Sequence, residues 1–256
     1  YIFHLAAIVG VKNVLRRPYD VLNKNYLLLK NIIDCAKNQK KLERFIFFST
    51  SEVYACTLKD FSIKFPTPET TKLSVGNSFE ERNTYMLSKI YGEAMCIHSN
   101  LPVTIIRPHN FYGPRMGLSH VIPELLKQAH ETKNGIIEIG NTNHKRTFCY
   151  ITDAIEIIYK LTSSKKTLGG TYNVGDELNE ITINQLGQKV IETVDKKIKI
   201  RPIKVENDSP KRRCPSMLRA NKAVKYRMKT SLTDGLKICY KWYSKNVFNS
   251  KEVSSI

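Results

Sequence analysis

The sequence predicts an α/β fold, built on a partial, doubly wound parallel sheet with a smaller C-terminal lobe. Short apolar runs alternate with longer segments of helical period, which is the pattern of strand–helix–strand units. The run at residues 45–48 is continuously apolar, as expected of a strand buried on both faces of a sheet. The chain has 256 residues, of which 41% are hydrophobic, so it is long and apolar enough for a packed core.

The first part of the chain is expected to alternate strands and helices. Each expected strand is a short apolar run, and these runs are residues 2–5, 45–48 and 103–106. Each expected helix repeats apolar residues every three or four positions, and these segments are residues 18–37 and 85–98. Residues 57–80 hold prolines, a glycine and several hydroxyl residues, so we expect a loop there.

The amino-acid composition changes at Gly113, after which glycine, proline and asparagine become frequent. The expected strands are residues 136–139 and 172–174, with a further short strand and a basic loop within 196–215. The expected helices are residues 122–130, 152–161, 183–194 and 233–242. Thr152 or Asp153 can cap the second of these helices, Thr182 the third and Thr233 the fourth. We therefore expect one domain over 1–112 and a lobe over 113–256, with 148–174 returning to the sheet.

Composition and charge exclude several classes of protein. The net charge is +18, which fits a nucleic acid partner, an anionic small substrate or merely a lysine-rich surface. No helix-turn-helix, zinc finger or RNP-like strand accompanies the basic clusters, so nucleic acid is not expected as a partner. No apolar run is long enough to span a membrane, and no signal peptide is evident. The six cysteines are scattered, so we expect no metal site, no disulfide framework and a cytoplasmic location.

One spacing on the second expected helix points to acid–base chemistry. Tyr85 and Lys89 are four residues apart and therefore lie on the same face of a helix. An ammonium group beside a phenol stabilises the phenolate and lowers its pKa, which would give a base that works near neutral pH. The hydroxyls of Ser49, Thr50 and Ser51 follow the buried strand 45–48, at the strand end where open α/β sheets place ligands.

These residues belong to a longer ordered series. The series consists of H-L-A-A at 4–7, S-T-S-E-V-Y at 49–54, Y-x-x-x-K at 85–89, R-P-H-N-F-Y-G-P at 107–114, R-x-F-x-Y-I-x-D at 146–153, Y-N-V-G at 172–175 and K-R-R-C-P at 211–215. It resembles the extended short-chain dehydrogenase/reductases, a family of NAD-dependent nucleotide-sugar epimerases, dehydratases and decarboxylases with a Rossmann-type sheet. The match covers nearly the whole chain, although Ser216 stands where the family usually has an aspartate.

The resemblance implies a role for each matching residue. Tyr85 would be the catalytic base, Lys89 would hold the nicotinamide ribose and lower the pKa of Tyr85, and Thr50, with Ser51 beside it, would bind the reacting hydroxyl. The implied NAD-binding residues are Leu5, Ala6, Ala7, Asn25, Ser49, Tyr85, Lys89 and Pro108. The implied substrate-binding residues are Asn110, Arg115, Arg146 and Arg213, of which the last two would neutralise the diphosphate of the substrate. No metal is implied, and the partner would be a second copy of the chain.

The resemblance leaves the reaction open. We expect first an epimerase acting on a UDP-sugar through a transient keto-sugar. The alternatives are a UDP-glucuronate decarboxylase or a nucleotide-sugar 4,6-dehydratase, which Glu52 favours because decarboxylases and dehydratases of the family use a glutamate there. A further alternative is a non-catalytic remnant that binds a nucleotide sugar or a partner chain.

The family's glycine-rich turn, G-x-x-G-x-x-G, does not occur in residues 1–256. In the family those glycines bring the backbone close to the pyrophosphate of the cofactor. The chain begins at what would be the fourth strand of the family, so we expect a truncated chain or one completed by another polypeptide, with weak NAD binding on its own.

Overall fold

The computed structural model describes residues 1–77, 80–205 and 209–249. Contacts divide them into two units. Unit 1 comprises Tyr1–His109, Ile155–Gly175 and Pro215–Tyr226. Unit 2 comprises Asn110–Ala154, Asp176–Cys214 and the described residues from Arg227 on. Unit 1 thus includes a late segment, 215–226, that lies within the part expected to form the C-terminal lobe.

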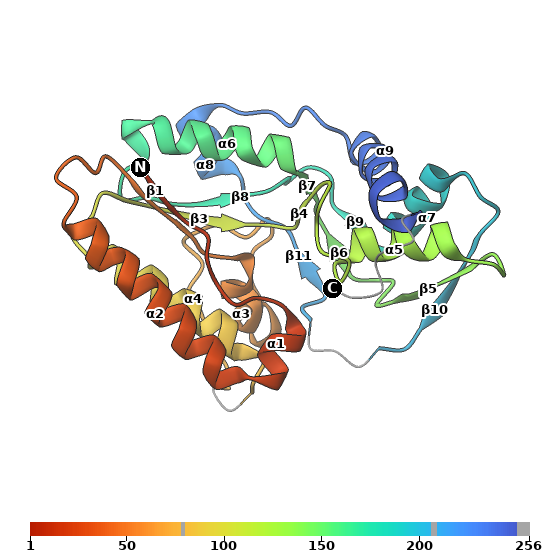
Figure 1. The fold of residues 1–256 in the computed structure, drawn as a ribbon, viewed down its shortest axis with the longest axis horizontal. Helices are drawn as coiled ribbons and strands as arrows, with labels where there is room; N and C mark the ends of the chain where they lie inside the picture. The colour runs from red at the N-terminus through yellow and green to blue at the C-terminus, as the bar shows by residue number, and fades with distance from the viewer. Residues whose placement is uncertain (78–79, 206–208, 250–256) are drawn as a thin grey trace. The chain divides into compact units, whose positions relative to one another are not determined.

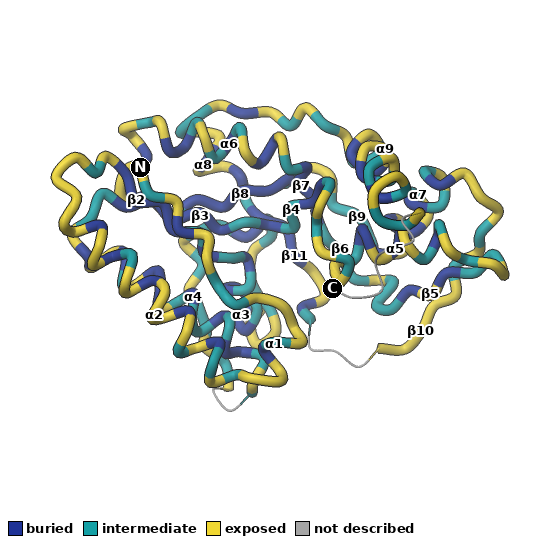
Figure 2. The backbone as a smooth tube through the Cα atoms, viewed as in Figure 1, coloured by how far each residue is buried: buried dark blue, intermediate teal, exposed yellow. Residues whose placement is uncertain are grey.

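Unit 1 is built on a parallel sheet. Its strands lie in the order β1-β2-β3-β8, which are Ile2–His4, Phe45–Phe48, Val103–Pro108 and Thr171–Val174. All three neighbouring pairs are parallel, and Phe47 pairs with His4 on one side and with Ile105 on the other. The buried faces of β2 and β3 form the dark band through this unit in Figure 2. The α/β class and the parallel sheet expected from the sequence are confirmed.

Helices cover both faces of this sheet. Figure 1 shows α2 (Pro18–Lys37) and α4 (Asn83–Ile97) side by side on one face, and α6 (Ile151–Ser163) on the other. The short helix α8 (Leu218–Val224) packs against β8. Leu29 of α2 and Cys96 of α4 are buried with Phe45 and Phe47 of β2 in one apolar cluster. This packing fixes α4 against the sheet, and Lys89 of α4 reaches the carboxyl end of β2, where the candidate site lies.

Unit 2 has its own apolar core. The helices α5 (Val121–Glu131), α7 (Ile183–Val194) and α9 (Leu232–Tyr243) pack around Leu126, Leu186 and Leu236, all fully buried. Its small sheets pair β5 (Ile136–Gly140) with β10 (Lys199–Ile203), and β4 (Phe111–Tyr112) with β7 (Cys149–Tyr150). A third small sheet has the order β11-β6-β9, which are Arg212–Arg213, Lys145–Arg146 and Ile181–Thr182.

Several expected elements need correction. Residues 51–60 are helical, as the 3-10 helix η1 (Ser51–Tyr54) and the helix α3 (Ala55–Asp60), so the expected loop begins later. A short helix α1 (Val11–Arg16), unpredicted from the sequence, follows Gly10, whose φ of 95° favours glycine. Helix α9 is capped by Ser231, whose Oγ accepts the N–H of Asp234 at 3.1 Å, and not by Thr233.

Candidate active site

Helix α4 directs Tyr85 and Lys89 toward the end of β2. The Lys89 Nζ lies 5.9 Å from the centre of the Tyr85 ring and 4.9 Å from the centre of the Phe47 ring. It donates a hydrogen bond to the carbonyl oxygen of Phe48 at 2.8 Å. The two side chains therefore share one helix face, as their spacing predicts. Lys89 is only 4% exposed, and this burial lowers its pKa to about 8.

The phenol of Tyr85 is less acidic than the sequence led us to expect. Burial raises the pKa of Tyr85 to about 12, and the negative charge of Glu52 adds to the rise. A hydrogen bond with the Thr50 hydroxyl acts in the opposite direction, because it stabilises the phenolate. The pKa of Tyr85 is therefore not lowered overall, because desolvation outweighs the interaction that stabilises the phenolate.

The segment after β2 places the candidate hydroxyls beside this phenol. Thr50 has an extended backbone and caps η1, where its Oγ1 accepts the N–H of Glu52 at 3.2 Å. Ser51 is buried and Glu52 is half-buried within η1. The Thr50 hydroxyl thus interacts with both Tyr85 and the backbone of η1. The arrangement brings a phenol, a hydroxyl and a carboxylate together at the carboxyl end of β2.

Asn25 of α2 connects the segment after β1 to helix α4. Its Oδ1 accepts the N–H of Ile8 at 2.7 Å, and its Nδ2 donates to the Ser88 hydroxyl at 3.1 Å. That hydroxyl donates in turn to the carbonyl oxygen of Tyr85 at 2.7 Å. The remaining candidate cofactor residues of unit 1 lie at strand ends: Leu5 and Ala6 are exposed after β1, Ala7 is half-buried, Ser49 is buried after β2 and Pro108 is half-buried at the end of β3.

The candidate substrate residues lie in unit 2. Arg146 of β6 and Arg213 of β11 are register partners on neighbouring parallel strands, so two guanidinium side chains leave adjacent positions of one small sheet. The Nη2 of Arg146 donates to the Ser209 Oγ at 2.9 Å and to the Pro210 carbonyl oxygen at 2.8 Å. Arg146 thus contacts the loop that leads into β11. Two adjacent cations make this sheet suited to an anion such as a diphosphate.

Asn110 and Arg115 complete the candidate substrate residues. Both have a positive φ, of 44° and 67°, and Asn110 Nδ2 donates to the carbonyl oxygen of Thr147 at 2.9 Å.

Asp153, expected to cap its own helix, instead accepts hydrogen bonds from the backbone N–H groups of Lys229 and Thr230 at 2.9 and 3.1 Å. It therefore tethers the segment before α9.

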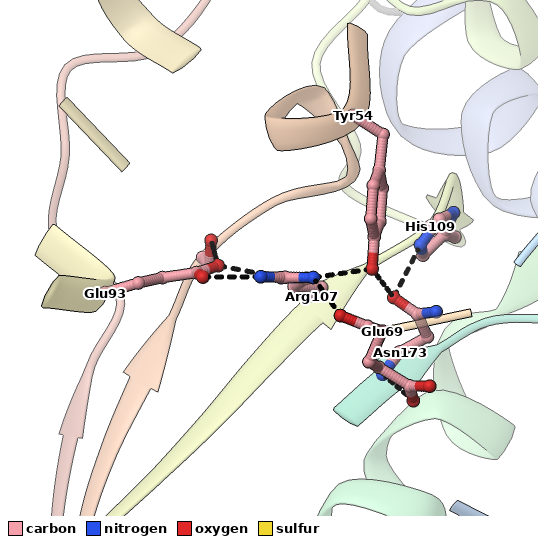
Figure 3. Close-up of polar contacts among 7 residues, drawn as sticks. Tyr54, Glu69, Glu93, Arg107, His109 and Asn173 are labelled. Atoms are coloured by element: carbon pink, nitrogen blue, oxygen red, sulfur yellow. Dashed lines mark hydrogen bonds and ion pairs between the residues drawn. The ribbon is translucent and has the colours of Figure 1, made fainter. Parts of the chain in front are cut away.

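Sequence reasoning missed a buried polar network next to the site (Figure 3). Arg107, at the end of β3, donates two hydrogen bonds to Glu93 of α4, from Nε to Oε1 at 2.8 Å and from Nη2 to Oε2 at 2.6 Å. Its Nη1 donates to the Tyr54 hydroxyl at 2.7 Å, and that hydroxyl donates to Asn173 Oδ1 at 2.9 Å. His109 Nε2 donates to the same Asn173 oxygen at 3.2 Å. Arg107, His109, Tyr54 and Asn173 all lie in the motifs of the sequence, whereas Glu93 lies outside them, and no motif indicated that these residues contact one another.

No helix within the described ranges is long and apolar enough to cross a membrane. The same ranges hold no cluster of three or more histidine, cysteine or acidic side chains that could bind a metal ion.

Comparisons with known proteins agree with this architecture. The chain is 29% identical, over 94% of its length and 76% of the relative's, to a UDP-N-acetyl-alpha-D-glucosaminuronate decarboxylase of Bacillus cytotoxicus. It superposes on RMD from Pseudomonas aeruginosa complexed with NADPH with a TM-score of 0.83 and 22% identity, covering 95% of this chain and 81% of that one. It also superposes on UDP-glucuronic acid 4-epimerase from Bacillus cereus, solved with UDP-glucuronic acid and NAD, with a TM-score of 0.79 and 25% identity, covering 95% and 74%.

A family model decides the assignment. The model of the NAD dependent epimerase/dehydratase family matches residues 1–175, which is more than half of the chain and includes Thr50, Tyr85 and Lys89. The chain therefore belongs to the NAD-dependent epimerase/dehydratase family of nucleotide-sugar-modifying enzymes.

Proposed function

We propose that the protein oxidises a hydroxyl of a UDP-linked hexuronic acid with NAD⁺ and then decarboxylates the resulting keto-sugar. The observation that carries the proposal is the Tyr85 phenol, which faces the Thr50 hydroxyl and the Lys89 ammonium at the end of β2. The sugar class is supported by the B. cytotoxicus decarboxylase and the B. cereus epimerase, both of which act on UDP-linked uronic acids by name.

The donors on Lys89 fit a nicotinamide ribose. An ammonium group carries three N–H donors, and among the described residues the Lys89 Nζ donates one hydrogen bond, to the Phe48 carbonyl oxygen. Two donors on a buried side chain are therefore left for the hydroxyls of a sugar. Small or apolar residues at the strand ends, Ala6, Ala7 and Pro108, would leave room for the cofactor, with Leu5, Asn25 and Ser49 around it. NAD⁺, when bound, supplies the hydride acceptor and a positive charge that favours the phenolate of Tyr85.

The chain's own residues manage the protons. Tyr85 takes the proton of the sugar hydroxyl that becomes the ketone, and the Thr50 hydroxyl, with Ser51 beside it, holds that oxygen in place. The carboxylate of the uronic acid then lies β to the ketone, so the bond to the carboxyl carbon breaks, CO₂ leaves and the electron pair moves onto the ketone oxygen. Tyr85 and Thr50 donate hydrogen bonds to that oxygen as it becomes negative. Glu52 is the candidate to protonate the carbon that lost CO₂.

The substrate's diphosphate would be held by unit 2. Arg146 and Arg213 emerge from adjacent strand positions, and a diphosphate would offset the repulsion between their charges. Asn110, after β3, and Arg115, after β4, are the remaining candidates for contacts to the nucleotide and its phosphates.

Epimerisation at the same carbon is the second candidate function, and the likeness to the B. cereus UDP-glucuronic acid 4-epimerase favours it. Both reactions begin with the same oxidation, so Tyr85, Lys89 and Thr50 serve either one. They differ afterwards, because an epimerase returns the hydride to the opposite face of the keto-sugar and the sugar loses no carbon. A 4,6-dehydratase would need a substrate with a hydroxyl at the sixth carbon instead of a carboxylate.

One experiment separates these reactions. The protein is incubated with NAD⁺ and UDP-glucuronate, UDP-N-acetylglucosaminuronate or UDP-glucose, and the products are identified by mass spectrometry and NMR. We expect the uronate substrates to lose CO₂, whereas a product of unchanged mass and inverted configuration would identify an epimerase. Tyr85→Phe is the control and should lose at least about 100-fold in turnover while binding the substrate normally. Calorimetric binding of NAD⁺ and a UDP-sugar with no turnover by the wild-type protein would favour the non-catalytic alternative.

A further inference from the structure

The ion pair between Glu93 and Arg107 lies in the interior of unit 1. Their side chains are 7% and 6% exposed, and the guanidinium meets the carboxylate through two nearly parallel hydrogen bonds of 2.6 and 2.8 Å. Such a fork fixes the relative orientation of both groups, as a lysine in place of the arginine would not. It therefore connects helix α4 rigidly to the end of strand β3.

The same pair holds both ends of the segment that carries the candidate hydroxyls. At the first end, the Ser49 hydroxyl donates to Glu93 Oε1 at 2.5 Å. At the other end, Arg107 Nη1 donates to the Tyr54 hydroxyl, five residues along the chain. The guanidinium also lies over the Tyr54 ring, 5.0 Å from its centre. Thr50, Ser51 and Glu52 lie between these two anchors.

Helix α4 brings this anchor and the candidate base into register. Tyr85, Lys89 and Glu93 follow one another at intervals of four residues and so lie along one face over about 12 Å. Each of them contacts the chain at the end of β2 or just after it, through the Thr50 hydroxyl, the Phe48 carbonyl oxygen and the Ser49 hydroxyl respectively. The segment 48–50 is thus connected to this helix face at three consecutive residues.

We propose that Glu93 and Arg107 are positioning residues, which hold the Thr50 hydroxyl against the Tyr85 phenol by fixing Ser49 and Tyr54 at the two ends of their segment. Neither residue touches the substrate in this proposal. It rests on the proposed function in so far as Tyr85 is the catalytic base. A misplacement of a reacting group by about 1 Å can cost on the order of 100-fold in rate, so the anchors matter for turnover more than for binding.

The decisive variant is Tyr54→Phe. It keeps the buried ring but removes the hydroxyl that links Arg107 to η1. The matched control is Tyr243→Phe, which removes the hydroxyl of another tyrosine that is 1% exposed, one that donates to the carbonyl oxygen of Met116 in unit 2. We expect Tyr54→Phe to lower kcat about tenfold and to leave the KM values for NAD⁺ and the UDP-sugar within about twofold. Tyr243→Phe should leave kcat unchanged even if both variants melt earlier.

A kcat for Tyr54→Phe equal to that of the wild type, with melting temperatures shifted alike in both variants, would overturn the proposal. Amide hydrogen exchange gives a second readout that does not depend on activity. Exchange over residues 49–54 should increase in Tyr54→Phe and stay unchanged in Tyr243→Phe, and no increase in the first variant would also overturn it. If the wild type converts no nucleotide sugar, the proposed function has failed, whereas the exchange measurement still decides the positioning role. Should Tyr54→Phe fail to fold, Ser49→Ala removes the other anchor and is judged by exchange over residues 49–54, which should increase, because Ser49 is also a candidate cofactor residue and its kcat would report on both roles.

Discussion

His4 is a buried histidine at the end of β1, and its environment should make the free energy of unfolding depend on pH. Its ring stacks on the Phe47 ring, with 6.0 Å between the ring centres and an angle of 11° between the planes. Burial, helped by the nearby positive charge of Lys89, lowers the pKa of His4 to about 4 from its usual value of 6.5. Between these two values the unfolded chain binds a proton that the folded chain excludes.

The folded state should therefore lose stability as the pH falls from 6.5 to about 4, and regain it as the pH rises. We predict that His4→Phe makes the free energy of unfolding less dependent on pH in this window, because the stacked ring remains and the titrating group is gone. Urea denaturation at several pH values measures this. Equal slopes in the wild type and His4→Phe would contradict the prediction.

Tyr85 shows what a sequence pattern can and cannot predict about a single residue. The spacing of Tyr85 and Lys89 predicts a shared helix face, and the structure has it. The spacing holds no information on how deeply the phenol is buried, however, and burial raises its pKa. Likewise, Arg107 and Glu93 are 14 residues apart and meet only because α4 crosses the end of β3. No local pattern in the sequence could have predicted that pair.

At the scale of elements, long periodic segments were predicted better than short ones. The helix expected at 18–37 is α2, and the helix expected at 183–194 is α7, whose Thr182 forms the expected cap with the N–H of Gln185. Helices α1 and α3 have six residues each, too few for a period to emerge. Ser231 and Thr233 are both suitable N-cap residues two positions apart, so composition could not choose between them.

Gly92 sets how closely α4 approaches the sheet. A Cβ at this position would lie 2.6 Å from Cζ of Phe47 and 3.1 Å from a methyl carbon of Leu29. We predict that Gly92→Ala destabilises the protein by about 1–3 kcal/mol, because the added methyl forces α4 away from β2 and α2. This exceeds the gain of up to about 1 kcal/mol that alanine brings to a helix. Denaturant unfolding followed by circular dichroism measures the difference.

Gly117→Ala, in the segment between β4 and α5, is the control for the added methyl group. Its added Cβ would meet no atom closer than 3.7 Å, the Cδ2 of His120, which is ordinary van der Waals contact. We expect its free energy of unfolding to stay within about 0.5 kcal/mol of the wild type. If the two alanine variants were equally stable, the close approach of α4 to β2 would not be the reason for glycine at position 92.

At the scale of the whole molecule, the charge of +18 agrees with an anionic substrate, since a UDP-uronate carries its charge on both the diphosphate and the sugar. Several basic residues are already paired at the surface, as Arg212 is with Glu180 through two hydrogen bonds of 2.7 and 2.9 Å. Charge alone therefore says little about the substrate. The neighbouring Arg146 and Arg213 of unit 2 are a more specific feature.

The outer surface of α2 and α4 is the candidate contact for a second copy of the chain. Tyr19 and Tyr91 are 74% and 55% exposed there, and the ring centres of Tyr26 and Tyr91 lie 6.0 Å apart. Together with Leu22 and Leu87 they line one surface hollow across the two helices. Large apolar side chains gathered on two neighbouring helices are typical of an interface between subunits. We therefore predict a homodimer formed through α2 and α4.

Tyr91→Glu tests this interface, because it places a charge in the middle of the apolar surface and should convert the dimer to a monomer. The control is Tyr159→Glu, which changes a tyrosine that is 69% exposed on α6, the helix on the opposite face of the sheet (Figure 1). Sedimentation velocity at micromolar concentration measures the mass of each protein. We expect the wild type and Tyr159→Glu to sediment as dimers and Tyr91→Glu as a monomer. A monomeric wild type, or a dimer that survives Tyr91→Glu and dissociates with Tyr159→Glu, would show that α2 and α4 do not form the contact.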